Sequence, residues 1–375
     1  MTPKIARFLE RERPGAPCLV VDLDVVERNY LRLRELMPPA EIYYAVKANP
    51  AADILERLVG LGSSFDAASI GEVEACLAAG APPDRVSHGN TIKKLADISH
   101  AFRLGIDLFA FDSRVELEKL AKAAPGARVF CRIALDNTGA GWPLSRKFGC
   151  SLETARELML RAAEMGMDPH GISFHVGSQQ CDINQWDIAI GRSAMLFSDL
   201  AESGLELGML NLGGGFPIPY RETVPSPEEI AAFIRRSLTR HFGNRLPGLI
   251  IEPGRAVAAD AGVIRSEVVL VAHREPGGER WVYLDIGKFS GLAETTGDAI
   301  RYRLRSSREG GETGPVMLAG PTCDGADILY ESTDYELPLA LGVGDHVDIL
   351  STGAYTTTYS SVGFNGFPPL KAYYI

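Results

Sequence analysis

Short apolar runs alternate with longer amphipathic stretches through the first two thirds of the chain. The runs are rich in β-branched and aromatic residues and are bounded by glycine, proline or polar residues, which is typical of buried strands. They predict strands over 42–47, 63–67, 84–88, 106–111, 127–134, 171–176, 208–212 and 248–252. The stretches between them carry apolar residues at i, i+3 and i+4. These stretches predict helices over 51–61, 69–79, 91–103, 113–123, 151–165, 184–203 and 226–242.

Strands that alternate with helices pair in parallel through crossover connections. The predicted strands and helices fit a TIM-like (β/α)8 barrel, whose usual length is ~250 residues. A doubly wound parallel sheet is the alternative that the same pattern allows. The expected fold class of this part of the chain is therefore α/β.

The pattern changes after Arg255, where short β-branched segments are separated by glycine-rich turns and helical spacing stops. This change predicts a second, mostly antiparallel β domain. The segment 17–23 near the N-terminus is also strand-like and can join it. We therefore expect the barrel to span residues 24–257 and the β domain to combine residues 1–23 with residues 258–375.

The composition is that of a soluble globular protein, with 46% hydrophobic and 23% charged residues in a chain of 375. The formal net charge of −10 disfavours nucleic acid and anionic membranes as partners. The chain has no run of ~20 apolar residues and no signal-like segment, so we expect a cytoplasmic protein. Six cysteines without CxxC spacing indicate reduced thiols and no metal site.

Polar residues gather where the predicted strands end. In a barrel, those carboxyl ends form one face, so residues distant in sequence meet in a single pocket. The residues concerned are Lys47, Asp66, His88, Arg132, His175, Gly213 to Gly215, Glu252 and Arg255. Most of them are expected to serve one site, whereas for His88 a structural role is expected.

Several of these residues suit one kind of ligand. A desolvated amine at Lys47 can attack an aldehyde, although a lysine that reaches solvent is the alternative. The glycines 213–215 let backbone N–H groups approach a phosphate, or form only a flexible loop. Glu252 and Arg255 supply a hydrogen-bond acceptor and a phosphate partner, or pair on the surface. With the flat ring of His175, the set matches pyridoxal 5′-phosphate, which has an aldehyde, a phosphate and a pyridine nitrogen.

Sequence motifs along nearly the whole chain carry a family resemblance. They are YYAVKAN (43–49), FDAAS (65–69), KFG (147–149), HVGSQ (175–179), GGGFP (213–217), EPGR (252–255), GPTCDGAD (320–327), GAYT (353–356) and FNGF (364–367). In order and spacing they resemble the alanine-racemase-fold (fold III) amino-acid decarboxylases. The most similar branch is the ornithine decarboxylase family with its bacterial ornithine/lysine members.

The resemblance implies how the cofactor is held. Lys47 would form the internal aldimine, His175 would stack on the ring, and Glu252 would face the pyridine nitrogen. The remaining implied cofactor-binding residues hold the phosphate or support the pocket wall; they are Asp66, Arg132, Ser178, Gly213, Gly214, Gly215, Gly254, Arg255 and Tyr355. A carboxylate at Glu252 keeps the ring protonated, which favours decarboxylation over racemization.

The resemblance also implies the substrate and the partner. Cys323 would return a proton after carbon dioxide leaves, and Asp324 would meet the distal ammonium, with Glu294 and Tyr355 as further substrate contacts. Both Cys323 and Asp324 would reach into the site of a second copy, so a homodimer is expected. The expected reaction is ornithine to putrescine in polyamine biosynthesis, or lysine to cadaverine. The alternatives are a diaminopimelate or arginine decarboxylase, or an inactive homologue that regulates a partner.

Overall fold

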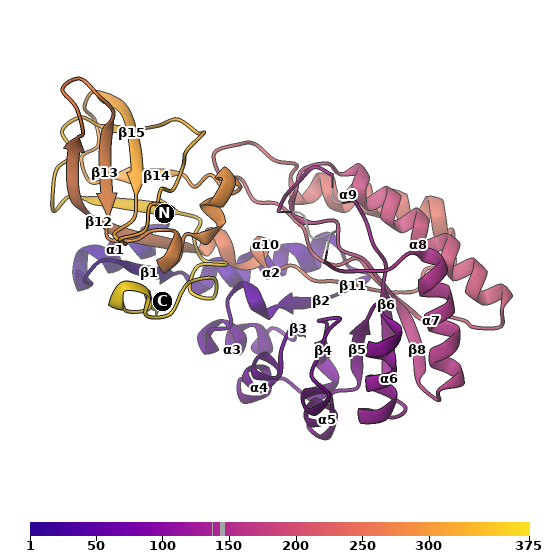
Figure 1. Cartoon of the computed structure of the whole chain (residues 1–375). Helices are drawn as coiled ribbons and strands as arrows, with labels where there is room; N and C mark the ends of the chain where they lie inside the picture. The colour runs from indigo at the N-terminus through magenta and orange to yellow at the C-terminus, as the bar shows by residue number, and fades with distance from the viewer. Residues whose placement is uncertain (137, 143–146) are drawn as a thin grey trace. The chain divides into compact units, whose positions relative to one another are not determined.

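The structure is a computed structural model that describes residues 1–136, 138–142 and 147–375 (Figure 1). The chain forms two compact units. Unit 1 contains Met1–Val26, Ile218–Thr223 and Arg255–Ile375, and unit 2 contains Glu27–Pro217 and Val224–Gly254. The first boundary between the units falls within helix α2 (Leu23–Leu36). The short segment around Tyr220 belongs to unit 1, although the residues on both sides of it belong to unit 2.

Unit 2 is a closed barrel of parallel strands in the order β10-β11-β2-β3-β4-β5-β6-β8. The strands are β2 (Ala40–Ala45), β3 (Ser64–Ala67), β4 (Val86–His88), β5 (Leu108–Phe111), β6 (Arg128–Arg132), β8 (Asp168–Ser173), β10 (Met209–Asn211) and β11 (Gly248–Ile251). Each predicted strand is confirmed. Because the sheet closes between β8 and β10, the doubly wound alternative is wrong.

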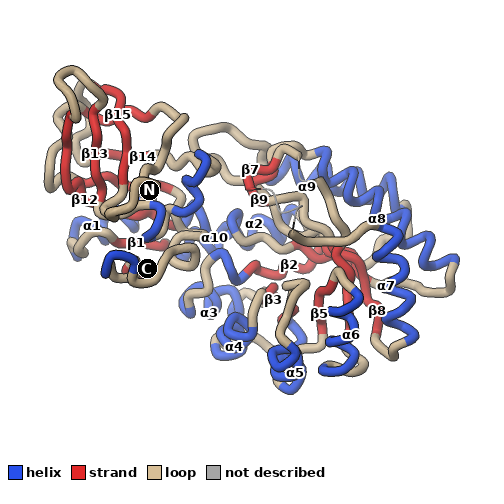
Figure 2. The backbone as a smooth tube through the Cα atoms, viewed as in Figure 1, coloured by secondary structure: helices blue, strands red, loops and turns tan. Residues whose placement is uncertain are grey.

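Helices follow the barrel strands in chain order (Figure 2). They are α3 (Ala52–Gly60), α4 (Ile70–Ala78), α5 (Leu95–Arg103), α6 (Arg114–Ala123), α7 (Leu152–Glu164), α8 (Asn184–Glu202) and α9 (Pro227–Phe242). Several begin at a serine whose hydroxyl accepts a backbone N–H from the first turn, as Ser69, Ser113 and Ser151 do. Ser226 and Glu229 form a complete capping box at the start of α9. The predicted helices are thus confirmed.

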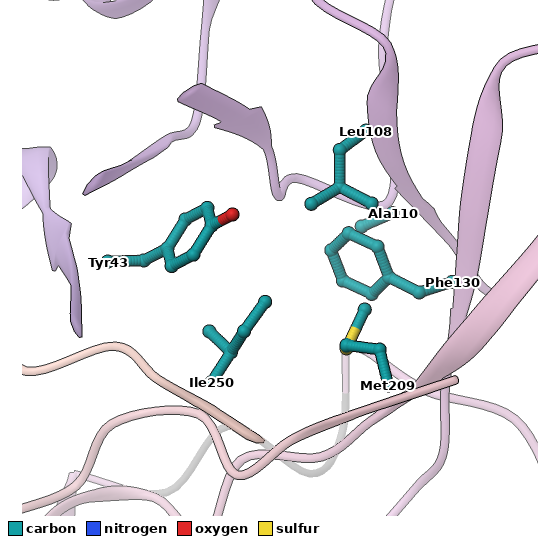
Figure 3. Close-up of a cluster of buried hydrophobic side chains, with 6 residues drawn as sticks. All are labelled: Tyr43, Leu108, Ala110, Phe130, Met209 and Ile250. Carbon is teal, nitrogen blue, oxygen red and sulfur yellow. The ribbon is translucent and has the colours of Figure 1, made fainter. Parts of the chain in front are cut away.

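The interior of the barrel is filled by apolar side chains that point toward one another from β2, β5, β6, β10 and β11 (Figure 3). They are Tyr43, Leu108, Ala110, Phe130, Met209 and Ile250. A barrel core of this kind is packed rather than hollow, so it fixes the strand ends above it. The polar residues at those ends are therefore held on a rigid base.

Unit 1 contains a mostly antiparallel sheet, as predicted. Its strands are β1 (Cys18–Val21), β12 (Gly262–His273), β13 (Arg280–Leu284), β14 (Leu304–Ser306), β15 (Thr313–Ala319), β16 (Tyr335–Pro338), β17 (His346–Leu350) and β18 (Lys371–Tyr374). The N-terminal strand β1 lies between β12 and β18, so both chain ends join the sheet. Ile5, Leu9, Cys18, Val20 and Val263 form its core beside β1.

Helix α2 was not predicted from the sequence, and neither were two further features. The first is helix α1 (Pro3–Glu12) in unit 1, which is highly charged and buries only Ile5 and Leu9. The second is the hairpin-like pair β7 (Ala140–Trp142) and β9 (Ser178–Gln180) in unit 2, which is too short to show alternation. Among the helices of the described residues, none has the length and apolar character to cross a membrane.

Candidate active site

Five polar side chains meet at the carboxyl end of the barrel in unit 2. Lys47 follows β2, Asp66 lies in β3, Arg132 ends β6, His175 follows β8, and Glu252 follows β11. Charges in this group act on one another, because Lys47 and Arg132 shift the pKa values of the two carboxyls and of the histidine. The sequence predicted such a convergence, and the structure brings these five side chains together, while their roles stay predictions.

Lys47 does not continue strand β2 as predicted. The strand ends at Ala45, and Lys47 lies in the 3-10 turn η1 (Val46–Ala48), partly buried. Gly254 packs against this turn, since a Cβ atom there would lie 2.8 Å from the Ala48 Cβ. The absence of a side chain at Gly254 is therefore explained by close packing of the Lys47 turn against the loop after β11.

Glu252 accepts a hydrogen bond from the Asn211 amide, with 2.5 Å between Nδ2 and Oε1. Burial, together with the nearby Asp66 carboxyl, raises the pKa of Glu252 to about 7, against the opposing effect of Lys47. Asn211 also accepts the N–H of Gly213 at 2.9 Å, so it ties the acid to the glycine loop. The sequence analysis missed Asn211, whose only signal was its place at the end of β10.

Asp66 is buried in β3 and accepts a hydrogen bond from the Ser87 hydroxyl at 3.3 Å. Burial raises the pKa of Asp66, while Lys47 and Arg132 oppose the increase. A Cβ at Gly89 would fall 1.8 Å from the carboxylate oxygen of Asp66. Gly89 is therefore required to leave space for this carboxyl group.

His175 is held as a neutral imidazole. Burial lowers its pKa well below the ordinary value, and the positive charges of Arg132 and Lys47 add to the decrease. The N–H of Gly177 donates to Nδ1 at 3.0 Å, so Nδ1 is the acceptor and Nε2 carries the hydrogen. A neutral ring can present its face to an aromatic ligand without a charge to desolvate.

The glycine loop 213–215 follows β10. Gly213 and Gly215 have φ values of 64° and 100°, in the region that favours glycine. A Cβ at any of the three would lie 2.3–2.6 Å from a backbone oxygen of residues 174, 177 or 252. The three glycines are thus needed for the packing of the loop itself, whether or not it binds phosphate.

Arg132 lies 4.9 Å from the ring centroid of Phe148, in the KFG segment. Burial lowers the pKa of this guanidinium, and the Glu252 carboxyl opposes the decrease. Ser178 begins strand β9 beside Trp142. Its expected phosphate contact stays a prediction.

Arg255 belongs to unit 1, where it forms a buried pair with Glu294. Its Nη2 donates to Oε1 at 2.6 Å and its Nη1 to Oε2 at 2.8 Å. Nη1 also donates to the Tyr220 hydroxyl at 2.8 Å, and the Tyr355 ring centroid lies 4.8 Å from the guanidinium carbon. Burial opposes the charge of Arg255, but Glu294 raises its pKa well above the ordinary value. The sequence analysis did not anticipate this pairing.

Cys323 and Asp324 lie in an exposed turn of unit 1. The backbone N–H of Cys323 donates to the Asn365 side chain at 2.9 Å. Below the turn, buried Asp327 accepts hydrogen bonds from the backbone and hydroxyl of Thr322 and from the backbone of Lys288. Asp327 is a second residue that the sequence analysis missed, and it fixes the shape of the turn.

His88 is buried at the end of β4, where Ser87 faces Asp66 and His88 therefore faces the opposite side of the strand. Burial lowers its pKa to about 3, and Lys93 adds to the decrease. The expected structural role of His88 stays a prediction, and its buried Nδ1 has no hydrogen-bond partner among the described residues. Among the residues that the structure describes, no group of three or more acidic, histidine or cysteine side chains could hold a metal ion.

Comparisons with known proteins give consistent matches. A family model described as "Pyridoxal-dependent decarboxylase, pyridoxal binding domain" matches residues 23–259. The chain is 35% identical over 369 residues to the lysine/ornithine decarboxylase of Selenomonas ruminantium. The aligned region covers 98% of this chain and 91% of that protein. The lysine/ornithine decarboxylase of Vibrio vulnificus, complexed with cadaverine, has a TM-score of 0.90 at 33% identity and covers 100% of this chain and 99% of its own. The arginine decarboxylase of Paramecium bursaria Chlorella virus, bound to agmatine, has a TM-score of 0.90 at 27% identity, with 99% and 100% covered.

Proposed function

The chain belongs to the pyridoxal-dependent decarboxylase family, and from this premise we propose that it removes the α-carboxyl group of L-ornithine to give putrescine. It is a carboxy-lyase that acts on a basic amino acid with pyridoxal 5′-phosphate as cofactor. L-Lysine, which gives cadaverine, is the second substrate. The observation that carries this proposal is the meeting of Lys47, His175 and Glu252 at one end of the barrel.

The side chains of unit 2 fit this cofactor. Lys47 supplies an amine for the aldehyde carbon, neutral His175 supplies a flat and uncharged ring, and Glu252 supplies a carboxyl group for the pyridine nitrogen. Gly213 to Gly215 form a loop without side chains next to His175 and Glu252. The donor set therefore matches the three chemical features of the ligand.

When bound, the cofactor supplies an electron sink for the pair of electrons that carbon dioxide leaves on the α-carbon. Glu252 would hold a proton on the pyridine nitrogen of the bound cofactor, which a neutral or cationic partner would do less well. Asn211 fixes the orientation of Glu252 through its amide. Asp66 and Arg132 balance the charge around Lys47 and Glu252.

We assign protonation of the α-carbon to Cys323 and recognition of the distal ammonium to Asp324. The two side chains are neighbours in one turn, whose shape Asp327 and Asn365 fix. A carboxylate attracts an ammonium group, so Asp324 favours ornithine and lysine over an amino acid with a distal carboxylate. The contacts of Ser178, Gly254, Arg255 and Tyr355 with the cofactor, and those of Glu294 and Tyr355 with the substrate, stay predictions.

We further propose that the protein acts as a homodimer. Cys323 and Asp324 are exposed on unit 1, whereas a proton donor and an ammonium partner work best where water is excluded. Two large apolar residues near Asn365 in the sequence are exposed. Val362 is 88% exposed and Phe367 is 37% exposed. A second copy that covers this surface would enclose the turn. A cytoplasmic location also stays a prediction.

The experiment that tests the function compares substrates side by side. The purified protein, loaded with pyridoxal 5′-phosphate, is given ornithine, lysine, arginine or diaminopimelate, and released carbon dioxide and amine are measured. We expect the highest kcat/KM with ornithine. Lysine should give a lower but measurable value, because one additional methylene changes binding by only ~1–3 kcal/mol. Preference for arginine or diaminopimelate would reassign the substrate. No carbon dioxide from any of the four would support the inactive regulatory homologue instead.

A further inference from the structure

Two cysteines of unit 2 lie in contact beside the proposed active site. The Sγ atoms of Cys131 and Cys150 are 3.6 Å apart. Cys131 is fully buried in β6, whereas Cys150 is partly exposed. Neither thiol has a task in the proposed reaction.

The backbone holds Cys150 against β6. Its N–H donates to the carbonyl of Arg132 at 3.1 Å, and its carbonyl accepts the N–H of Ala134 at 2.9 Å. Cys131 is the residue before Arg132 in the same strand. The short distance between the sulfur atoms is therefore supported by an isolated parallel β-bridge between Ile133 and Cys150, which holds the two backbones side by side.

We propose that Cys131 and Cys150 form an oxidation site, at which hydrogen peroxide converts the two thiols into an intramolecular disulfide. Cys150 reacts first because it is the accessible thiol. Its sulfur takes one oxygen as the O–O bond breaks, and the departing hydroxide takes up the Cys150 thiol proton, which gives a sulfenic acid and one water. The Cys131 sulfur then attacks the Cys150 sulfur, the S–S bond forms, and the S–O bond breaks. The oxygen leaves as water with the proton of the Cys131 thiol. The net result is one disulfide and two waters from two thiols and one peroxide.

The disulfide alters the surroundings of Arg132. A disulfide bond is ~2.05 Å long, so the two sulfur atoms must approach by about 1.5 Å. Cys131 is fixed between neighbouring barrel strands, so the movement falls on Cys150 and the KFG segment before it. That segment has little room, because a Cβ at Gly149 would already lie 2.7 Å from the Ala134 nitrogen.

Arg132 is coupled to this segment at two points. Its carbonyl accepts the Cys150 N–H, and its guanidinium lies 4.9 Å from the Phe148 ring centroid. Movement of the segment therefore displaces the guanidinium that balances Asp66 and Glu252. A misplacement of about 1 Å near reacting groups can cost ~10²-fold in rate. This effect on turnover rests on the proposed function, whereas the formation of the disulfide does not.

The test uses the full chain loaded with pyridoxal 5′-phosphate, oxidised with hydrogen peroxide. Three proteins are compared: wild type, Cys150→Ser, and Cys181→Ser as a control for an exposed thiol elsewhere. Digestion under non-reducing conditions is expected to yield a linked peptide pair containing Cys131 and Cys150 in wild type and Cys181→Ser. The pair is expected to be absent from Cys150→Ser and to disappear after treatment with dithiothreitol. Oxidation of other cysteines without this linked pair would overturn the proposal.

Turnover of ornithine is measured on the same samples. Oxidised wild type is expected to lose ~10- to 100-fold more activity than oxidised Cys150→Ser, and dithiothreitol is expected to restore this difference. The comparison with Cys150→Ser removes the contribution of Cys323, which both proteins retain. Equal losses in the two proteins would overturn the coupling to Arg132. If no sample turns over ornithine, the proposed function fails while the peptide result still decides the oxidation site.

Discussion

Glu252 combines an unusual pKa with a fixed position. Its pKa of about 7 lies above that of an ordinary glutamate because burial and Asp66 disfavour the charged form. The hydrogen bond from Asn211 fixes the orientation of the Glu252 carboxyl group in both of its charge states. A positively charged ring nitrogen next to Glu252 would favour its ionised carboxylate form. Cofactor binding and ionisation of Glu252 are therefore linked.

The first prediction concerns the pH dependence of the cofactor-free protein. Since the folded state raises the pKa of Glu252, it binds more protons than the unfolded state, and stability falls as pH rises from about 4.5 to about 7. Glu252→Gln keeps the acceptor for Asn211 and removes the titration. We expect the variant to lose about 2 kcal/mol less than wild type over this range, as measured by urea unfolding at each pH. Parallel pH profiles would contradict the assignment.

The second prediction separates two roles for Glu294. Both of its oxygens accept from Arg255, so Glu294→Gln should loosen the guanidinium and weaken cofactor retention by about tenfold. Dialysis followed by fluorescence titration with pyridoxal 5′-phosphate measures this affinity. Glu309→Gln, which breaks an exposed pair with Arg305, is the matched control. An increase in KM for ornithine with unchanged cofactor affinity would contradict this role and support Glu294 as a substrate contact.

The convergence of side chains could be predicted from the sequence where polar residues follow the ends of buried strands. Lys47, His175 and Glu252 were found in this way, and the structure brings them together. Asn211 and Asp327 were missed because amides and carboxylates are common in loops, and only the structure shows what they bind. The partner of Arg255 was also missed, because Glu294 lies in an irregular 3-10 segment without a periodic signal.

At the scale of elements, the barrel depends on its central side chains. Phe130 from β6 is 2% exposed and packs among apolar residues of four other strands (Figure 3). Phe130→Ala should therefore lower the free energy of unfolding by ~3–5 kcal/mol. Denaturant titration measures the change. Val115→Ala, on a residue of α6 that is 68% exposed, should change it by less than ~0.5 kcal/mol. Similar values for the two variants would contradict the assigned core.

The barrel elements could be predicted because their signals are local. Buried parallel strands are continuous apolar runs, and serine caps mark the starts of α4, α6, α7 and α9. Helix α1 also has start signals, the N-cap Thr2 and the following Pro3, but only Ile5 and Leu9 of its residues are buried, on a sheet formed by distant segments, so its apolar pattern is weak. Strands β7 and β9 likewise depend on each other and not on their own sequences.

At the scale of the whole molecule, the question is whether one chain holds a complete site. The proposed proton donor Cys323 is exposed on unit 1, and the proposed cofactor lysine Lys47 belongs to unit 2. If each site combines Lys47 of one copy with Cys323 of another, two inactive variants should complement each other. Association between copies could not be read from hydrophobic periodicity, because that pattern reports burial within one chain.

The complementation experiment mixes Lys47→Ala and Cys323→Ala proteins after reversible dissociation. A mixed dimer would contain one site with both residues intact, so activity should return to about 25% of wild type when half of the dimers are mixed. Each variant treated alone is the control. A mixture no more active than its components would count against sites shared between copies.

The central claim is that Lys47 binds pyridoxal 5′-phosphate covalently. Reduction of the loaded protein with borohydride, followed by peptide mapping, tests this most directly. We expect one phosphopyridoxyl group, located on the peptide that contains Lys47, and none after Lys47→Ala. A label on another lysine, or no label on a protein that still releases carbon dioxide from ornithine, would contradict it.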